Sequence, residues 1–366
     1  MREIEAQHLV IGGGPIGLAT ADHLLRRGAE GVVVLERGQT PGQARRGAPG
    51  FLLSSPHPDH VELGARSHLL LEEWPEYLEI DPRFRCSGSL NLDPSEPLPG
   101  DWENLATDDP RRRHGPVETN GRVAFAPKDG VVDPSELTSA LHWQVRKRGG
   151  RVLTDCAVDR LSLKGERVAF DAIRRSGSAR KVYLTAGASI PLLIRTLGVE
   201  TGVERTFATW QRMTLHGPPL DFGLIRAWRT LAEDSSDVGL DLLEGFGEAE
   251  ATGAWPGETQ VLLMHADGRI EFSAWVPSGP QPGEIPVDWT LWERARGEFV
   301  DAVPALADAT VRSGSAELVL QPSGVGDVSI ESLCDGRVLV APALGAGGLF
   351  YSLSIGERLA EAGLQG

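Results

Sequence analysis

Cysteine is scarce in this sequence, and its spacing is irregular. The 366 residues include 3 cysteines, Cys86, Cys156 and Cys334, which lie far apart along the chain. An odd number of isolated thiols does not match the spacing of a disulfide framework or a zinc site. We therefore expect reduced thiols in a cytoplasmic protein. His57 and His60 lie three residues apart, but no other ligand type stands near them with metal-binding spacing, so no metal site is predicted.

Basic residues and long apolar runs are also few. The chain holds 36 Lys and Arg residues against 51 Asp and Glu residues, a formal net charge of −15. Such a charge disfavours nucleic acid or an anionic membrane surface as a partner. No apolar run approaches the ~18 residues of a membrane span, and no targeting signal precedes the first predicted strand. The length suits about two domains.

The most informative stretch is His8–Arg37. Within it, Leu9–Ile11 is a short apolar run typical of a strand buried on both faces. The glycines that follow fit the pattern G-x-G-x-x-G, and a predicted helix then ends at Gly28. Val32–Leu35 predicts a second strand with Glu36 at its tip. Strand, glycine-rich turn, helix, strand and acid in this order predict a dinucleotide-binding unit.

Each residue type in this unit has a physical reason. Gly12 allows a tight turn, Gly14 lets a pyrophosphate approach the backbone, and Gly17 lets the helix pack on the strand. Unpaired N–H groups and the positive end of the helix dipole favour phosphates at the start of the helix. A carboxylate at the strand tip can accept hydrogen bonds from a ribose hydroxyl, which argues against a 2′-phosphate there. The predicted contacts are Gly12, Gly14, Pro15, Ile16, Gly17, Glu36 and Arg37.

Two later junctions repeat the change from strand through small residues to helix. A strand ending before Thr185–Ala188 leads into a predicted helix over Ile190–Leu197. Another strand is followed by Gly345–Gly348 and by a final predicted helix over Ser354–Glu361. Both junctions would place backbone N–H groups beside a cofactor.

The middle of the chain has a different pattern. Phe207–Leu215 and Ile270–Val276 predict strands, and the second carries Trp275. Strands with aromatic residues suit a second sheet that roofs a substrate pocket. We therefore predict a two-domain α/β protein. A nucleotide-binding domain covers 1–85, 130–205 and 316–366, and a mainly antiparallel substrate-binding cap covers 86–129 and 206–315.

Separated blocks of the sequence together resemble one family. The first block is the glycine-rich motif of Gly12–Gly17. The second is Val132–Pro134 followed by Gly149–Val152, and the third is Thr185–Ala188 followed by Leu197-Gly198. In this order they resemble the FAD-dependent amine oxidases of the D-amino acid oxidase superfamily, in particular the glycine oxidase and sarcosine oxidase branch. The run that begins at Gly348-Leu349-Phe350-Tyr351 is similar to that branch's closing helix.

The resemblance implies a glutathione reductase-like, Rossmann-type domain that binds FAD in an extended pose. The backbone of Val158 would touch the adenine, and Ala186 and Gly187 would lie near the phosphates. Arg45 and Arg46 are candidates for flavin-side contacts, and two solvated loop arginines are the alternative. The remaining predicted cofactor contacts are Gly47, Gly345, Gly347, Gly348, Leu349 and Phe350.

The activity that the resemblance implies is oxidation of a C–N bond. A small-molecule amine would lose hydride from the carbon bonded to nitrogen and give an imine, and molecular oxygen would reoxidise the flavin to yield hydrogen peroxide. The cofactor carries that chemistry while the protein positions the C–H bond. No cysteine between Arg312 and Gly324 matches the flavin-linking cysteine of the sarcosine oxidase branch, so we expect non-covalent FAD.

The substrate side departs from the family pattern. Two arginines and a tyrosine hold the substrate carboxylate in glycine oxidase-like members, and the corresponding places here are Val319 or Gln321, Ala346 and about Val261. Without a bidentate carboxylate clamp, the pocket suits a larger or less acidic amine. Arg226 is a candidate replacement contact, and the residues predicted to act at the reacting centre are Tyr351, Arg312 and Trp275. The alternative for Tyr351 is that its side chain fills the core, and the alternative for Arg312 is that it is an ordinary surface residue.

Other functions stay open at this point. A flavin hydroxylase that uses NAD(P)H usually carries a Gly-Asp motif after the last cofactor strand, where this chain reads Ala341-Pro342-Ala343. A protein that keeps the fold for binding or for redox-neutral chemistry is the second alternative, because the substrate signature is weak. An NAD dehydrogenase would leave the two later glycine-rich junctions unexplained.

Overall fold

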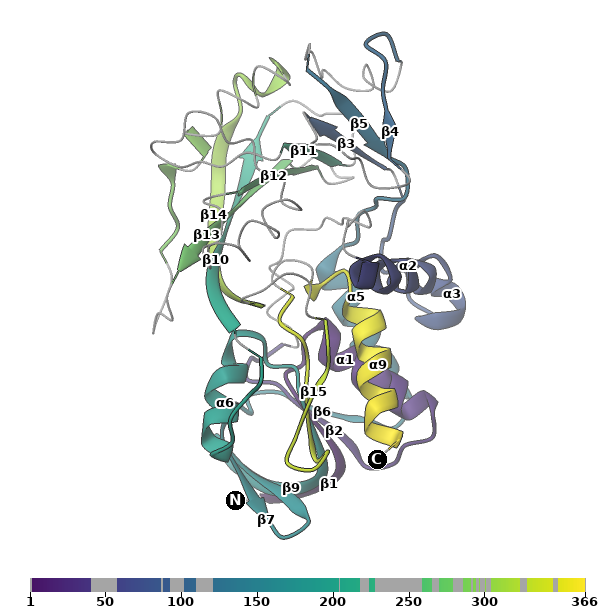
Figure 1. The fold of residues 1–366 in the computed structure, drawn as a ribbon, viewed down its shortest axis with the longest axis vertical. Helices are drawn as coiled ribbons and strands as arrows, with labels where there is room; N and C mark the ends of the chain where they lie inside the picture. The colour runs from purple at the N-terminus through teal and green to yellow at the C-terminus, as the bar shows by residue number, and fades with distance from the viewer. Residues whose placement is uncertain are drawn as a thin grey trace.

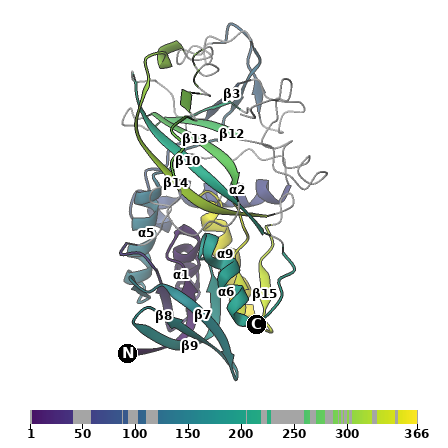
Figure 2. The same ribbon diagram turned by 90° about the vertical axis from the view of Figure 1, so that its left-hand side faces the viewer.

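The computed structural model has two β-sheets in its described part, one beyond the end of the other along the long axis of the molecule, and helices that pack mainly on the first (Figures 1 and 2). It describes residues 2–40, 58–86, 88–92, 102–109, 121–203, 205–217, 224–227, 259–264, 270–278, 286–290, 292–293, 296, 300, 304–322, 328–344 and 348–365. For some residues of these strands and helices only the backbone is described. Both chain ends lie on the side of the first sheet (Figure 1).

The first sheet has a parallel centre. It comprises β1 (Arg2–Ile11), β2 (Val32–Leu35), β6 (Arg151–Leu153), β7 (Val158–Lys164), β8 (Arg167–Ala172), β9 (Arg175–Leu184), β15 (Glu331–Leu333) and β16 (Val338–Val340). The order is β15-β16-β9-β1-β2-β6, and the strands from β16 to β6 all run parallel. β7 and β8 form an antiparallel extension from β9.

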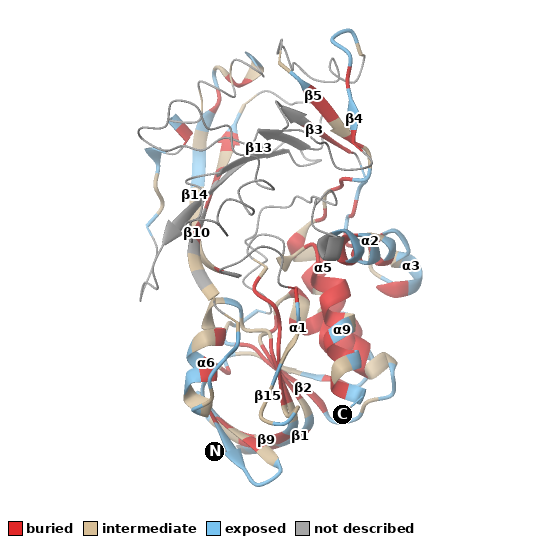
Figure 3. Ribbon diagram, in the orientation of Figure 1, coloured by how far each residue is buried: buried red, intermediate tan, exposed pale blue. Residues whose placement is uncertain are grey.

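Both faces of this sheet are buried, as an apolar parallel sheet requires. Val10 and Val34 belong to an apolar cluster shared with three helices, α1 (Pro15–Arg26), α5 (Pro134–Lys147) and α9 (Ser352–Gln365). Leu9 and Val33 belong to a second cluster on the opposite face, which includes α6 (Ile190–Leu197). The buried strands and the inner sides of α1 and α9 are red in Figure 3. Two further helices, α2 (Pro58–Glu72) and α3 (Trp74–Tyr77), contribute to the first cluster.

The central parallel strands end at the same level. Ile11 pairs with Leu35 on one side and with Leu184 on the other, and Leu184 pairs with Val340. Their carboxyl ends therefore form a single edge, and the second sheet stands beyond it (Figure 1). Open α/β sheets bind ligands at such an edge.

The second sheet is mainly antiparallel, as the sequence predicts. It comprises β3 (Ser89–Leu92), β4 (Glu103–Asn104), β5 (Val123–Ala126), β10 (Arg205–His216), β11 (Leu224–Ala227), β12 (Thr259–Met264), β13 (Ile270–Ser278) and β14 (Thr310–Pro322). The order is β14-β10-β13-β12-β11-β3-β5-β4, in which only the described pair β11–β3 is parallel. The domain limits remain a prediction, and β14 crosses the limit predicted at 315/316.

Several predicted elements are confirmed. β2 and α6 have the predicted bounds, and β10 extends the predicted strand by two residues at its start and one at its end. The last helix begins at Ser352 rather than at Ser354, because Ile355 N–H already donates to the Tyr351 carbonyl at 2.9 Å. Among the helices in the described part of the chain, none is long and apolar enough to cross a membrane.

The packing of α9 on α1 depends on a glycine. A Cβ on Gly356 would stand 2.5 Å from the Ala19 Cβ and 2.7 Å from the Thr20 nitrogen. We expect Gly356→Val to lower the free energy of unfolding by about 2–3 kcal/mol, because the two helices would be forced apart. Arg358→Val is the matched control, since Arg358 is exposed on the same helix and its replacement costs about 0.5 kcal/mol of helix propensity. Urea denaturation measures both variants, and equal losses would contradict this packing.

Candidate functional site

The turns after β1 and β9 meet at the edge of the first sheet. Gly12 has φ +111°, and its N–H donates to the Leu35 carbonyl at 2.9 Å. The Thr185 hydroxyl lies 3.0 Å from both the Ile11 and the Gly12 carbonyl oxygens. A Cβ on Gly12 would overlap the Thr185 carbonyl, so only glycine allows the two turns to touch. The predicted contacts Gly12 and Ala186 therefore lie side by side.

The start of α1 forms an open cradle. A Cβ on Gly17 would overlap the Gly12 carbonyl oxygen, whereas a Cβ on Gly14 would meet nothing within 4 Å. Gly14 is the N-cap residue in an extended conformation, and no side chain caps the helix. Pro15 is the first helical residue, and the N–H groups of the first turn have no partner within the helix. Space, free donors and the helix dipole together fit a phosphate group.

Glu36 follows β2 and is buried, with 7% of its surface exposed. Its Oε2 accepts a hydrogen bond from Gly13 N–H at 2.7 Å, and its Oε1 accepts one from Gly38 N–H at 2.8 Å. These bonds hold the carboxylate beside the cradle, and each oxygen retains a lone pair for a further donor such as a ribose hydroxyl. Arg37, the next residue, is exposed.

The connection from β6 to β7 runs along the same corner. Cys156 N–H donates to the Glu36 carbonyl at 2.9 Å, and Asp155 N–H donates to the Gly38 carbonyl at 3.0 Å. This brings Val158, the first residue of β7, to the cluster against which Ala186 also packs. Gly187 has φ +54° with open space where a Cβ would stand. The described contacts predicted for the adenine and phosphate end thus gather around one corner of the sheet.

The third junction reaches the same edge from β16. Ala341 N–H donates to the Leu184 carbonyl at 2.9 Å, and the chain continues to Gly348 and Leu349 before α9. Phe350 is buried in the apolar cluster of α1, α5 and α9. Of the remaining predicted cofactor contacts, Arg45, Arg46, Gly47, Gly345 and Gly347 lie outside the described residues.

Ser352 is a candidate that sequence reasoning missed. It is the first residue of α9 and is fully buried, yet its hydroxyl has no hydrogen-bond partner among the described residues. A buried hydroxyl without a partner costs free energy, so the position fits a bound group that accepts a hydrogen bond. The signal in the sequence is a serine four residues after Gly348. Because the predicted helix begins only at Ser354, that serine is not recognised as the first residue of the helix.

The comparison with protein families decides the identity. A family model described as "FAD dependent oxidoreductase" (DAO) matches residues 7–362. This chain belongs to that family. The resemblance drawn from the sequence is confirmed at the family level, and the open cradle, the buried Glu36 carboxylate and the unpartnered Ser352 hydroxyl fit its FAD cofactor.

Solved structures share the fold of this DAO-family flavoenzyme. L-proline dehydrogenase from P. horikoshii has a TM-score of 0.78 at 16% identity, over 98% of this chain and 93% of that one. Iminodiacetate oxidase from Chelativorans sp. BNC1 has a TM-score of 0.75 at 19% identity, over 98% and 95%. Glycine oxidase from Geobacillus kaustophilus has a TM-score of 0.75 at 18% identity, over 99% and 95%. No curated protein matches the sequence.

The residues predicted for the reacting centre lie on different parts of the enzyme. Tyr351 is 7% exposed, and its ring packs edge-on against Phe350, with the ring planes inclined at 63° and the ring centroids 5.0 Å apart. Arg312 is exposed on β14, where the register with β10 shifts. Trp275 lies on β13, paired in register with Trp210 of β10, and only its backbone is described. No described contact joins these three residues, and no group of acidic, Cys or His residues in the described part could hold a metal ion.

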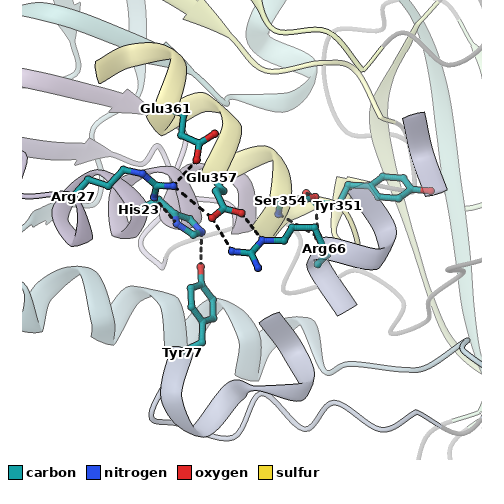
Figure 4. A network of polar contacts seen from close by, with 9 residues as sticks. His23, Arg27, Arg66, Tyr77, Tyr351, Ser354, Glu357 and Glu361 are labelled. Atoms are coloured by element: carbon teal, nitrogen blue, oxygen red, sulfur yellow. Dashed lines mark hydrogen bonds and ion pairs between the residues drawn. The ribbon is translucent and has the colours of Figure 1, made fainter. Parts of the chain in front are cut away.

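A polar network fixes the start of α9 against α2 (Figure 4). The Ser67 hydroxyl donates to the Ser354 hydroxyl at 2.9 Å, and the latter donates to the Tyr351 carbonyl at 3.0 Å. One turn further on, Glu357 accepts two hydrogen bonds from Arg66 at 2.6 and 2.8 Å. These bonds to Arg66 lower the pKa of the Glu357 carboxyl. The helix that carries Ser352 is thereby held in one position.

The network continues to a buried histidine on α1. His23 Nε2 lies 2.9 Å from the Tyr77 hydroxyl, and His23 Nδ1 lies 3.1 Å from an Arg27 guanidinium nitrogen, which can only donate (Figure 4). Arg27 also forms an ion pair with Glu361 at 2.6 Å. Burial lowers the pKa of His23 to about 3, and the charge of Arg27 acts in the same direction. The ring is therefore neutral in the folded enzyme near pH 7.

This pKa makes folding acid-sensitive. Between pH 6.5 and pH 3 the unfolded chain protonates His23 and the folded enzyme does not, so stability falls as the pH falls through this window. From pH 7 to pH 5 the loss from His23 is about 2 kcal/mol. We expect His23→Asn to flatten the pH dependence of unfolding by that amount.

Urea denaturation at intervals from pH 5 to pH 7 measures this dependence. His8 and His68 also have lowered pKa values, so the difference between wild type and the variant isolates His23. His216→Asn is the control, because His216 is exposed at the end of β10. If the free energy of unfolding of His23→Asn fell with pH as steeply as that of the wild type, His23 would not be the acid-sensitive group.

The open space at Gly14 allows a separate test of where the phosphates of the cofactor bind. A Cβ there meets no described atom within 4 Å, so we expect Gly14→Val to fold normally but to exclude the phosphates. We expect its FAD dissociation constant to rise at least about tenfold, or 1.4 kcal/mol. FAD titration of the apoprotein measures affinity, and thermal unfolding of the apoprotein measures the fold. Gly17→Val is the contrasting variant and should destabilise the apoprotein itself, whereas wild-type affinity in Gly14→Val would place the phosphates elsewhere.

Proposed function

We propose that this flavoenzyme oxidises a C–N bond of a small amine or N-substituted amino acid to an imine, with molecular oxygen as the acceptor. The observation that carries the proposal is the cradle of Gly12–Gly17 beside the buried Glu36, at a sheet edge that faces a second sheet. The fold neighbours named above are, by their names, a glycine oxidase, an iminodiacetate oxidase and a proline dehydrogenase, and each of those compounds is an amine.

The residues around the edge are assigned to successive parts of FAD. The Glu36 carboxylate accepts hydrogen bonds from the ribose hydroxyls, and the first N–H groups of α1 beside Gly14 donate hydrogen bonds to the pyrophosphate. The backbone of Val158 contacts the adenine, and Ala186 and Gly187 lie near the phosphates. Ser352 donates to the flavin end beside Gly348 and Leu349. Arg45 and Arg46 stay proposed flavin-side contacts, and the FAD is held without a covalent bond.

Bound FAD supplies a two-electron acceptor for hydride from the carbon next to nitrogen. The chain has the tasks of orienting the amine and keeping water from the reacting carbon. We assign these tasks to the second sheet through Trp275 and Arg312, and to Tyr351 at the start of α9. Burial of such a site strengthens each polar contact with the substrate.

The substrate class follows from the missing carboxylate clamp. The places of the family's two arginines and tyrosine are taken by Val319 or Gln321, Ala346 and about Val261, and none of these side chains can form a bidentate pair with a carboxylate. The preferred substrate is therefore an amine that is larger or less acidic than glycine.

Anaerobic reduction of the bound flavin tests the function. FAD-loaded enzyme is mixed with amines in matched pairs, each with and without an α-carboxylate, and flavin absorbance is followed. We expect bleaching by at least one amine, and faster bleaching by the member that lacks the carboxylate. Readmitted oxygen should restore the absorbance and release hydrogen peroxide, measured with peroxidase.

The control is Gly14→Val mixed with the same amines and the same concentration of free FAD, which should show less bleaching because less FAD is bound. Full FAD loading without bleaching by any amine would refute the proposed oxidation. Rapid bleaching by NADPH instead would indicate a flavin hydroxylase.

A further inference from the structure

In the described part of the chain, the backbone passes between the two sheets at two places, and each place joins one outgoing and one returning connection. At the first place, the segment before β3 pairs with the segment before α5. Arg85 N–H donates to the Val131 carbonyl at 2.8 Å, and Val131 N–H donates back at 2.9 Å. At the second place, the start of β10 lies beside the end of β14 and the start of β15. Figure 1 shows these attachments on opposite sides of the molecule, one above α5 and one above α6.

The second attachment is held by a buried ion pair. Arg205, the first residue of β10, donates to Glu331, the first residue of β15, with Nη2 to Oε2 at 2.8 Å. The side chains are only 4% and 10% exposed. The other carboxylate oxygen of Glu331 accepts from the Thr201 hydroxyl at 2.6 Å and from Gly202 N–H at 2.9 Å. Arg205 belongs to the second sheet and Glu331 to the first, and Thr201 and Gly202 lie on the segment between α6 and β10.

The same contacts fix the backbone of the outgoing segment. Nη1 of Arg205 donates to the Thr201 hydroxyl at 2.9 Å and to the Val203 carbonyl at 3.0 Å. A hinge needs a few residues that change φ and ψ freely. Here 201–203 are tied to two charged side chains at the point where a hinge would act. Relative motion is otherwise the default for two domains joined by a modest interface.

From this geometry we infer that Arg205 and Glu331 are a positioning pair that sets the tilt of the second sheet over the edge of the first. They act through β10 and β14, the strands that begin and end at the pair. No described contact joins either residue to those proposed cofactor contacts that the structure describes. That the positioned surface binds substrate rests on the proposed function, whereas the positioning itself does not.

Distances between spin labels test the positioning directly in FAD-loaded enzyme. Cys86 and Cys334 are replaced by serine, and the buried Cys156 is kept. One label is placed at Ile173→Cys, in the turn between β8 and β9 of the first sheet, and the second at Thr310→Cys on β14 or at Glu103→Cys on β4, all exposed positions. Double electron–electron resonance then gives a distance distribution for each pair.

We expect Arg205→Met to broaden the Ile173–Thr310 distribution about twofold or to shift its centre, because the second attachment becomes a free hinge. The Ile173–Glu103 distribution should stay narrow, because the backbone pair of Arg85 and Val131 is intact. Glu331→Gln keeps the shape of the side chain and removes its charge, and should give the same change. Glu331→Gln is the variant to measure if Arg205→Met does not fold.

The control is Arg27→Met, which breaks an ion pair of 2.6 Å with Glu361 within the first domain and should leave both distributions unchanged. Wild-type distributions in Arg205→Met and Glu331→Gln would overturn the inference. Equal broadening of both label pairs would also overturn it, because it would mean general loosening. These distances are measured without substrate, so failure of every amine to bleach the flavin would leave this result standing.

Discussion

The contact between the turns after β1 and β9 is the constraint on which the rest of the structure depends. The Thr185 hydroxyl bonds to the carbonyls of Ile11 and Gly12, and this approach is possible only because Gly12 lacks a Cβ. Gly17 then lets α1 begin directly against the same turn. The position of α1 in turn fixes α9, which packs on it through Gly356. One contact between two turns thus sets where two helix N-termini stand at the binding edge.

Much of this edge could be predicted from the sequence, because its signals are local. Val32–Leu35 is an apolar run bounded by Gly31 and Glu36, and β2 has those limits. The position of Glu36 at the strand tip follows directly. Its two backbone donors, Gly13 and Gly38, could not be predicted, because they depend on how the turns fold around the carboxylate. Ser352 was missed for a similar reason, since burial of its hydroxyl without a partner is a property of the packed helices.

The second sheet shows where sequence reasoning stops. Alternating apolar residues and tryptophans indicate strands. Which side chains of a strand face the pocket can be predicted only when its partner strands are known, and here the partners are distant in the sequence. β10 pairs with both β13 and β14, about 60 and 100 residues later in the chain. Arg312 lies where the register of the last pair shifts, and no local pattern marks that position. The ion pair of Arg205 and Glu331 joins residues with no relation in the sequence.

The order of the strands has a consequence for synthesis. β1 and β2 emerge early from the ribosome, but β9 and β16, which complete the centre of the sheet, and α9, which covers α1, come far later. A nascent chain that displays only the glycine-rich turn lacks Thr185 beneath it and α9 behind it. Binding of the nucleotide therefore requires β9, β16 and α9 as well as the N-terminal turn, and yellow colour in a preparation reports that these distant elements have assembled.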